Sequence, residues 1–160
     1  MTYNGTDLQD QRPEGTNAAG ATTATPRAAV AAFLDALGRG THEEALGWLS
    51  EDVRWQAPGD PAVVPWAGVW SGREEVRRFL NLLTSETETE DFGITELLPT
   101  GDRVFAVGWF DYRFPTWGGR FADSFVMEFE VDDGLIVSYR IHEDSYGLAR
   151  AYRGEALAAG

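Results

Sequence analysis

The stretch RVFAVGWFDYRFPTWGGRFADSFVMEFEVDDGLIVSYRIHE, residues 103–143, decides the fold of this chain. It contains three runs in which apolar and polar residues alternate, which is the period of a strand with one buried face. These runs are Arg103–Phe114, Arg120–Val131 and Leu135–Glu143. Short turn segments, Pro115–Gly119 and Asp132-Asp133-Gly134, separate them, and turns of this length join neighbouring antiparallel strands. The stretch therefore predicts an antiparallel meander.

Three helices are expected before the meander, each with a recognisable start. A capping residue followed by proline, or Ser/Thr with Glu three residues later, is typical of a helix N-terminus. The three starts are Thr25-Pro26, Thr41 with Glu44, and Ser71 with Glu74. Apolar residues recur at helical spacing within Val30–Leu37 and Val76–Leu83, so the first and third helices should each bury one face. A further cap, Asp144 or Ser145, should open a closing helical turn.

These elements predict the α+β class. Two more strands are expected at Val53–Gln56 and Glu88–Leu98. A curved antiparallel sheet with the helices on one of its faces would bury the apolar sides of both. The chain has 160 residues, enough for one such core and too few for two. We therefore predict a single domain over residues 25–153, with flexible tails at residues 1–24 and 154–160.

The composition argues against several kinds of function. A net charge of -13 repels phosphate backbones and anionic lipid heads, so neither nucleic acid nor a membrane is expected as a partner. The chain has no cysteine and only two histidines, so no metal site is expected. No phosphate-binding or nucleotide-binding motif occurs, and no cofactor is expected. With no membrane-spanning run and no apolar signal segment, the predicted location is the cytoplasm.

Asp123 is the most unusual residue of the meander. Alternation places it on the apolar face of its strand, between Phe121 and Phe125. An unpaired charge on such a face costs several kcal/mol or takes up a proton, and acid–base enzymes use carboxyl groups in this situation. Asp123 is therefore a candidate catalytic residue. The alternative is that it reaches water near the strand end and pairs with an arginine.

Asp111 is the second candidate catalytic residue. Counting outward from a hairpin centred near Trp117, Asp111 and Asp123 lie opposite each other and so share one face. Repulsion between two such carboxylates raises the pKa of one of them, which would allow one to act as the acid and the other as the base. The alternative for Asp111 is an ion pair with Arg113 or Arg120.

The last strand of the stretch ends in His142-Glu143-Asp144. Alternation points His142 away from the apolar face that Tyr139 and Ile141 share, so a surface role is expected for it rather than that of a general base. Asp144 is expected to cap a helix rather than to act as a catalyst.

The chain is rich in aromatic residues, which make up 12% of it and include six tryptophans. This is more than a core of this size buries simply, so part of the set is expected to form the wall of a ligand cavity. The alternative for at least half of them is ordinary core and sheet packing. The residues expected to line the cavity are Phe33, Trp55, Trp66, Trp109, Phe125, Met127 and Tyr139.

Two segments, residues 52–59 (DVRWQAPG) and 66–74 (WAGVWSGRE), carry a family resemblance. Together with Asp133-Gly134-Leu135-Ile136 and His142-Glu143-Asp144, they resemble the SnoaL-like, ketosteroid-isomerase-related branch of the nuclear transport factor 2-like superfamily. The resemblance covers about residues 26–152. It implies a conical, strongly bent antiparallel sheet closed by three N-terminal helices, with the pocket inside the cone. It also implies a homodimer formed through the outer sheet face.

The enzymes of this superfamily place their catalytic residues differently, and the resemblance transfers no complete set. The positions of the ketosteroid isomerase residues read Phe33, Ala57 and Phe125. Asp111 falls where limonene epoxide hydrolase has a water-activating aspartate, but that family's arginine and second acid correspond to Trp109 and Ile141. SnoaL-type cyclases place an acid–base aspartate on the last strand, where the nearby acids here are Glu143 and Asp144.

The predicted function is that of a cofactor-independent acid–base enzyme acting on a hydrophobic, polyketide- or terpenoid-like small molecule of secondary metabolism. The reaction would be isomerisation, cyclisation or epoxide opening, with Asp111 and Asp123 as the acid–base pair. The alternative is a non-catalytic domain that binds such a molecule or a partner protein.

Overall fold

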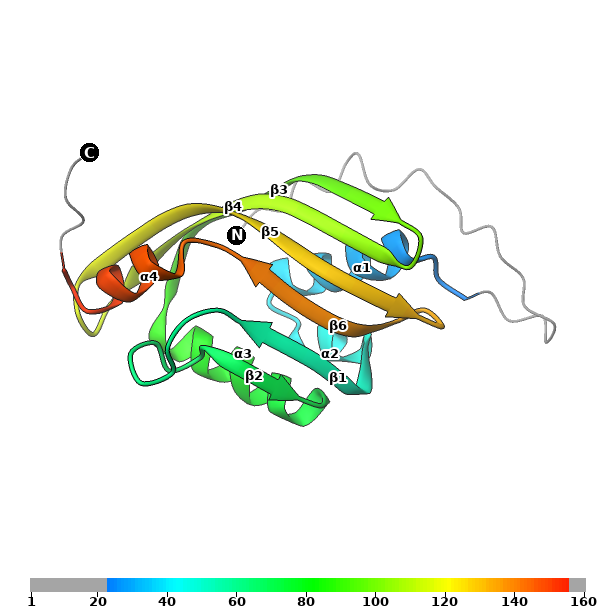
Figure 1. Ribbon diagram of the computed structural model, residues 1–160, viewed down its shortest axis with the longest axis horizontal. Coiled ribbons are helices and arrows are strands. Elements are labelled where there is room, and N and C mark those ends of the chain that lie inside the picture. Colours follow the sequence, from blue (N-terminus) through cyan, green and yellow to red (C-terminus); the bar gives the residue numbers. More distant parts are fainter. Residues whose placement is uncertain (1–22, 156–160) are drawn as a thin grey trace.

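The structure, a computed structural model, describes residues 23–155 as one curved, unclosed six-stranded sheet with helices packed against it (Figure 1). The elements are α1 (Pro26–Gly38), α2 (His42–Gly47), β1 (Leu49–Ala57), β2 (Gly68–Ser71), α3 (Arg73–Glu86), β3 (Glu88–Thr100), β4 (Arg103–Phe114), β5 (Gly119–Asp132), β6 (Leu135–His142) and α4 (Ser145–Tyr152). The predicted α+β class is confirmed. The two expected tails lie almost wholly outside the described residues.

The strand order in the sheet is β2-β1-β6-β5-β4-β3. The strands β3 to β6 form the predicted antiparallel meander, and Asp133 and Gly134 turn the last hairpin with φ angles of 47° and 77°. The sheet is not wholly antiparallel, however, because β1 pairs in parallel with β6. The edge strand β2 was not expected, since its four residues are all at least partly exposed and carry no apolar pattern.

The helices α1, α2 and α3 lie on one face of the sheet, behind the strands in Figure 1. The helix α1 contacts β3 to β6, while α3 contacts β1 and β2. All three expected helices are present, although α3 follows β1 and β2 in the chain instead of preceding every strand. The short helix α4 closes one end of the sheet against β5.

Two of the three helices begin differently from the prediction. The Thr25 hydroxyl caps α1 as expected, accepting a hydrogen bond of 3.2 Å from a first-turn amide. Thr41 makes no cap bond, and its hydroxyl donates to a carbonyl of α1. The N-cap of α3 is Gly72, and the carboxylate of Glu75 accepts from the amide of Ser71. Neither expected capping box forms.

The hairpin between β4 and β5 corrects the expected pairing of the two aspartates. Phe114 pairs with Gly119, so the connecting loop has four residues and its centre lies half a residue before the expected one. Asp111 therefore pairs with Ala122 and not with Asp123. A shift of one residue in register moves a side chain to the opposite face of the sheet. Asp123 stays on the inner face, as predicted, while Asp111 lies on the outer face.

The core lies between the helices and the inner face of the sheet. Phe33 of α1 is fully buried, with ring centroids 5.9 Å from both Trp55 of β1 and Phe129 of β5. Trp55 in turn stacks on Tyr139 of β6, at a centroid distance of 3.7 Å and an interplanar angle of 17°. Phe33, Trp55 and Tyr139 form part of the wall of the pocket described next.

Candidate active site

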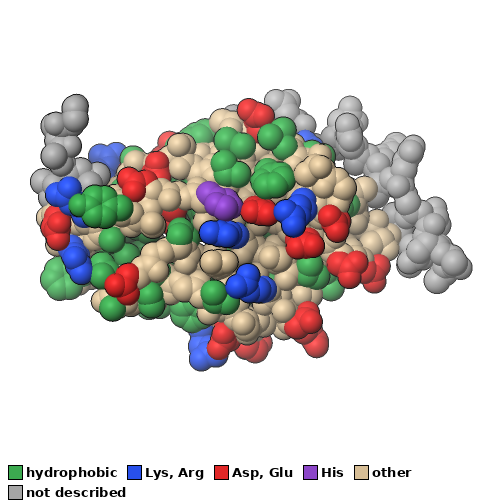
Figure 2. All heavy atoms as spheres, viewed as in Figure 1, with side chains coloured by type: hydrophobic (Ala, Val, Ile, Leu, Met, Phe, Trp, Pro, Cys, Tyr) green, Lys and Arg blue, Asp and Glu red, His purple; other side chains and the backbone are tan. Residues whose placement is uncertain are grey.

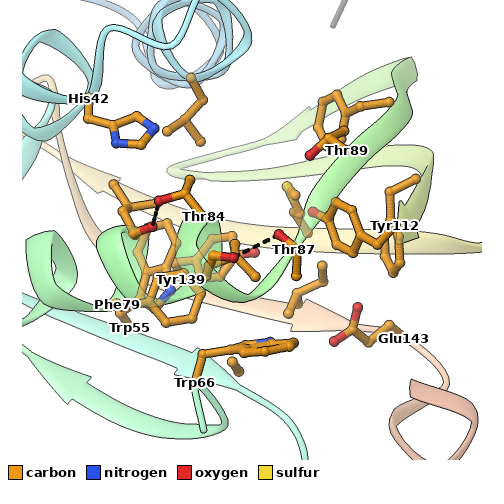
Figure 3. Close-up of a pocket in the computed structure, with 18 of the residues that line it drawn as sticks. His42, Trp55, Trp66, Phe79, Thr84, Thr87, Thr89, Tyr112, Tyr139 and Glu143 are labelled. Carbon is orange, nitrogen blue, oxygen red and sulfur yellow. Dashed lines mark hydrogen bonds between the residues drawn. The ribbon is translucent and has the colours of Figure 1, made fainter. Parts of the chain in front are cut away.

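A pocket of about 130 Å³ lies between the helices and the inner face of the sheet (Figure 3). Eight of its lining residues are aromatic, and they come from α1, β1, α3, β3 and β4, from the segment before β2, and from β6. The aromatic lining residues are Phe33, Trp55, Trp66, Phe79, Phe92, Phe110, Tyr112 and Tyr139. The pocket is thus largely apolar, as sites for small organic molecules commonly are.

Five of the seven expected lining residues do line this pocket. They are Phe33, Trp55, Trp66, Met127 and Tyr139. Phe125 does not, because its buried ring stacks between those of Phe92 and Phe110, with centroid distances of 5.6 and 5.8 Å. Trp109 is also absent from the lining, because it faces outward from β4, is 41% exposed, and donates its indole N–H to Asp91.

Glu143 is the only carboxyl group that lines the pocket among residues 23–155. It follows the end of β6, where Tyr139 and Ile141 also line the pocket, so the alternation of the strand continues inward to it. Burial raises the pKa of Glu143 to about 7, and the negative charges of Asp123 and Asp144 contribute to the same shift. A carboxyl group with this pKa can both accept and donate a proton at neutral pH.

Two tyrosines, Tyr112 and Tyr139, also line the pocket, and the charge of this carboxyl group affects both. Burial raises the pKa of both Tyr112 and Tyr139, and the negative charge of Glu143 raises both further. Figure 3 shows Tyr112 and Glu143 on the same side of the pocket. Within residues 23–155 neither phenol hydroxyl has a hydrogen-bond partner. Both tyrosines therefore remain neutral hydrogen-bond donors, available to a bound molecule.

The other polar lining residues are three threonines and His42, and Thr89 pairs with Tyr112 across β3 and β4, so it lies on the same side of the pocket as Tyr112. The hydroxyl groups of Thr84 and Thr87 donate to the carbonyls of Leu80 and Leu83 at 2.9 and 2.7 Å, so their protons are used within α3 and at its end. His42 lies on the side of the pocket opposite Glu143 (Figure 3). Glu143 and Tyr112 therefore share one side of the pocket, while Tyr139 lies with Trp55 and Phe79 (Figure 3).

Asp111 does not line the pocket. Its carboxylate forms two hydrogen bonds with the guanidinium of Arg120, one of them 2.8 Å from Nε, and this partner lowers the pKa of Asp111. The ion pair with Arg120, one of the two alternatives considered for Asp111, is therefore what the structure contains. The expected face-sharing pair of Asp111 with Asp123 is wrong because the register separates them.

Asp123 borders the site without lining the pocket. Each of its two carboxylate oxygens accepts a hydrogen bond of 2.8 Å. One comes from the backbone amide of Ser124 and the other from the backbone amide of Asp144. Asp123 thus holds the segment that follows β6 and acts on Glu143 through its charge. Its alternative partner, an arginine, is not what it contacts.

His142 and Asp144 lie where the sequence placed them. Asp144 caps α4 by accepting a hydrogen bond from the amide of Gly147. His142 is exposed on the outer face and lies 3.1 Å from Glu128, which Arg103 also contacts. Figure 2 shows this outer face, where acidic and basic side chains are interspersed.

Sequence reasoning missed Glu143 as a pocket residue, although a signal was present. Simple alternation continues the apolar positions Tyr139 and Ile141 of the last strand to Glu143. The resemblance to SnoaL-type cyclases, which have an acid–base aspartate on the last strand, also pointed to the position of Glu143 and Asp144. The sequence pattern indicated Asp123 instead, because a carboxylate between two phenylalanines interrupts the apolar face of a strand more clearly than a carboxylate at the end of a strand.

The raised pKa of Glu143 predicts how stability depends on pH. Between the ordinary pKa of 4.5 and about 7, the folded protein holds this proton while the unfolded chain has released it. The contribution of Glu143 is therefore favourable below pH 4.5 and is lost as the pH rises through 7. Glu143→Gln cannot lose a proton, so its free energy of unfolding at pH 8 should exceed that of wild type by roughly 2–3 kcal/mol.

Urea unfolding at pH 4 and pH 8 measures this difference. The two proteins should be nearly equal at pH 4, where Glu143 is protonated. Glu96→Gln, at an exposed position of β3, is the matched control and should change neither value. A wild-type protein and a Glu143→Gln variant with parallel pH dependence would contradict the raised pKa.

No group of three or more His, Cys, Asp or Glu residues within residues 23–155 is arranged to hold a metal ion. Nor does that part of the chain contain a helix of the length and hydropathy needed to cross a membrane.

Comparison with solved structures shows a common fold. A nuclear transport factor 2-like protein from Burkholderia xenovorans is 28% identical, with a TM-score of 0.71, over 86% of this chain and 99% of its own. One from Burkholderia thailandensis is 25% identical, with a TM-score of 0.73, over 80% and 97% of the two chains. A Mesorhizobium loti protein whose name proposes a SnoaL-like polyketide cyclase is 20% identical, with a TM-score of 0.59, over 69% and 92%.

A search of the curated proteins finds no match. A family model described as a SnoaL-like domain, however, matches residues 30–139, which is more than half of the chain. This match agrees with the curved sheet and the covering helices described above. The chain belongs to the SnoaL-like domain family.

Proposed function

We propose that this protein is an acid–base enzyme, an isomerase or a cyclase, that moves a proton on a hydrophobic small molecule. The proposal rests on one observation: the only carboxyl group lining an aromatic pocket, within residues 23–155, has its pKa raised to about 7. Glu143 is the proton carrier in this proposal. It lies outside the span of the family match, so family membership does not by itself assign the role.

The reaction that these side chains support begins at a carbon atom next to a carbonyl group. The Glu143 carboxylate takes a proton from that carbon, and the electron pair moves toward the carbonyl oxygen. The neutral hydroxyls of Tyr112 and Tyr139 can donate hydrogen bonds to the negative charge that develops there. Glu143 then returns the proton to a different carbon, which completes an isomerisation. Alternatively, the enolate attacks a second carbonyl, which closes a ring, and Glu143 returns the proton to the alkoxide oxygen formed there.

This assignment replaces the expected pair of Asp111 and Asp123. Asp111 is held by Arg120 on the outer face of the sheet, and neither aspartate lines the pocket. Epoxide opening is not part of the proposal, because the likeness to limonene epoxide hydrolase rested on Asp111. The role left to Asp123 is to raise the pKa of Glu143 and to hold Asp144.

A second candidate function is non-catalytic binding of a small molecule in the same pocket. The observation that favours it is the lone carboxyl group: the two aspartates that could have formed an acid–base pair are both engaged elsewhere, Asp111 by a guanidinium and Asp123 by backbone amides. Both candidate functions predict that a small molecule binds in the pocket, but only the enzyme converts it to a product.

The test uses 3-cyclohexen-1-one, a single-ring ketone that isomerises to 2-cyclohexen-1-one by moving one proton. The conjugated product absorbs in the ultraviolet, so the rate can be followed directly. We expect saturable catalysis with kcat rising with pH through a midpoint near 7, since the carboxylate form of Glu143 is the base. The rate should exceed that of acetate at the same concentration by at least about 10²-fold.

Two outcomes would count against this function. A rate no greater than that of acetate, with the ketone bound in the pocket by NMR, would support the binding function instead. A kcat that does not change between pH 5 and pH 9 would remove Glu143 as the base even if the reaction is accelerated.

A further inference from the structure

We propose that the substrate of this pocket is a single-ring compound that carries no negative charge. The inference deepens the proposed function and rests on it in one respect, namely that the pocket containing Glu143 is where the substrate binds. Of the polyketide- or terpenoid-like substrates expected from the sequence, the inference keeps only those that place a single ring in the pocket.

The volume of the pocket limits the size of the ring system. The cavity measures about 130 Å³. An apolar cavity of about 150 Å³ in another protein holds one benzene molecule. A six-membered ring with a small substituent therefore fills this pocket, and two fused rings exceed it.

The walls resist enlargement because aromatic rings hold one another in place. Trp55 is stacked on Tyr139 with a centroid distance of 3.7 Å. Trp66 packs against Phe114 at 6.2 Å and against Tyr152 at 5.3 Å, the latter edge to face. Widening the cavity would pull these rings apart. A close-packed interior resists such expansion, because separating packed atoms loses their van der Waals attraction. The aromatic part of the wall is thus held in place by the surrounding core.

The charges around the pocket exclude anions. The described lining contains no lysine or arginine, and its only carboxyl group is Glu143. Asp123 and Asp144 place two further negative charges close enough to raise the pKa of Glu143. His42, the remaining ionisable lining group besides the tyrosines, lies on the opposite side (Figure 3). A carboxylate or phosphate ester at this end would lose its water and meet negative charge without a compensating cation.

Three probes of matched ring chemistry test size and charge separately. Cyclohexanone is neutral with one ring, 1-decalone is neutral with two fused rings, and cyclohexanecarboxylate is a single ring with a negative charge. Binding is measured at pH 8 by isothermal titration calorimetry and by the fluorescence of the tryptophans that line the pocket. Cyclohexanone should bind at least ten-fold more tightly than either of the others. Equal affinities, or no binding of cyclohexanone up to its solubility limit, would overturn the inference.

Variants of the walls test the size argument. Met127→Ala removes three non-hydrogen atoms from the inner face of β5 and should raise the affinity for 1-decalone at least ten-fold, while cyclohexanecarboxylate remains excluded. Leu83→Ala enlarges the pocket from α3 and provides the same test if the first variant does not fold by circular dichroism. If neither folded variant gains affinity for the two-ring ketone, the size limit is not set by this cavity.

A second pair of variants tests the charge argument. Glu143→Gln removes the nearest negative charge, so the discrimination against cyclohexanecarboxylate should fall at least five-fold. Asp111→Asn removes one negative charge from the outer face and should leave the discrimination unchanged. Equal effects of the two substitutions would show that net charge, and not the pocket, repels anions, and would overturn this part of the inference.

These measurements separate the inference from the proposed function. Binding selectivity without isomerisation of 3-cyclohexen-1-one would refute the enzyme and leave the inferred ligand class in place. Isomerisation together with tight binding of 1-decalone or of the carboxylate would leave the enzyme in place and refute the ligand class.

Discussion

Glu143→Gln should lower kcat for the isomerisation of 3-cyclohexen-1-one at pH 8 by roughly 10²–10⁴-fold, the usual contribution of a general base. Glutamine keeps the shape of the side chain and its ability to form hydrogen bonds, but it cannot take a proton from carbon. KM should change little, because the ring contacts the aromatic walls and these are unaltered. The substitution should also increase stability at pH 8, so the loss of activity would not reflect unfolding.

The matched control is Asp111→Asn, which makes the same chemical change at a carboxylate outside the pocket. Its kcat should stay within about two-fold of wild type, because Asp111 does not line the pocket. The loss of the surface ion pair with Arg120 should lower the free energy of unfolding by at most about 1 kcal/mol. The residual activity of Glu143→Gln should lose the midpoint near pH 7. A kcat within three-fold of wild type, or an unchanged pH profile, would remove Glu143 from the mechanism.

Phe129→Ala should destabilise the protein by about 3–5 kcal/mol, the usual cost of removing a buried aromatic ring. Phe129 is fully buried in the last third of β5. Its ring packs edge to face against Phe33 at 5.9 Å and against Tyr139 at 5.3 Å. The substitution removes these contacts and leaves a cavity next to the pocket, and the rigid neighbouring rings can close only part of it.

Urea unfolding followed by tryptophan fluorescence measures the change in the free energy of unfolding. Leu98→Ala is the control: its side chain is 47% exposed on β3, and truncating it should cost no more than about 1 kcal/mol. A loss below about 1.5 kcal/mol for Phe129→Ala would mean that the core between α1 and β5 is less tightly packed than described.

The sequence predicted most of the secondary structure because local patterns report local geometry. The boundaries of β4 match the prediction, and those of β3, β5 and β6 differ from it by no more than two residues, since alternation with a period of two marks a strand with one buried face. The same pattern placed Asp123 on the inner face and His142 on the outer face. Proline, glycine and capping residues located the turns and the helices, apart from the details of two caps.

The pairing of elements distant in the chain was harder to predict. The short strand β2 has no apolar pattern of its own, and it forms because β1 offers a free edge. The parallel pairing of β1 with β6 joins residues that lie more than eighty positions apart, and nothing local signals it. Trp109 was expected in the cavity wall, but it faces outward because it shares a face with Asp111.

What the amino-acid sequence determined by itself was the class of fold, the meander and the aromatic character of the interior, because these follow from periods and turn residues that act over a few positions. Only the tertiary structure decided which acid faces the pocket. Because the loop between β4 and β5 has four residues, the register of the hairpin places Asp111 on the outer face, where it pairs with Arg120. The sheet and the helices together bury Glu143 close to the charges of Asp123 and Asp144. The pKa of a carboxyl group depends on what surrounds it in space, and those surroundings come from segments that lie far apart in the chain.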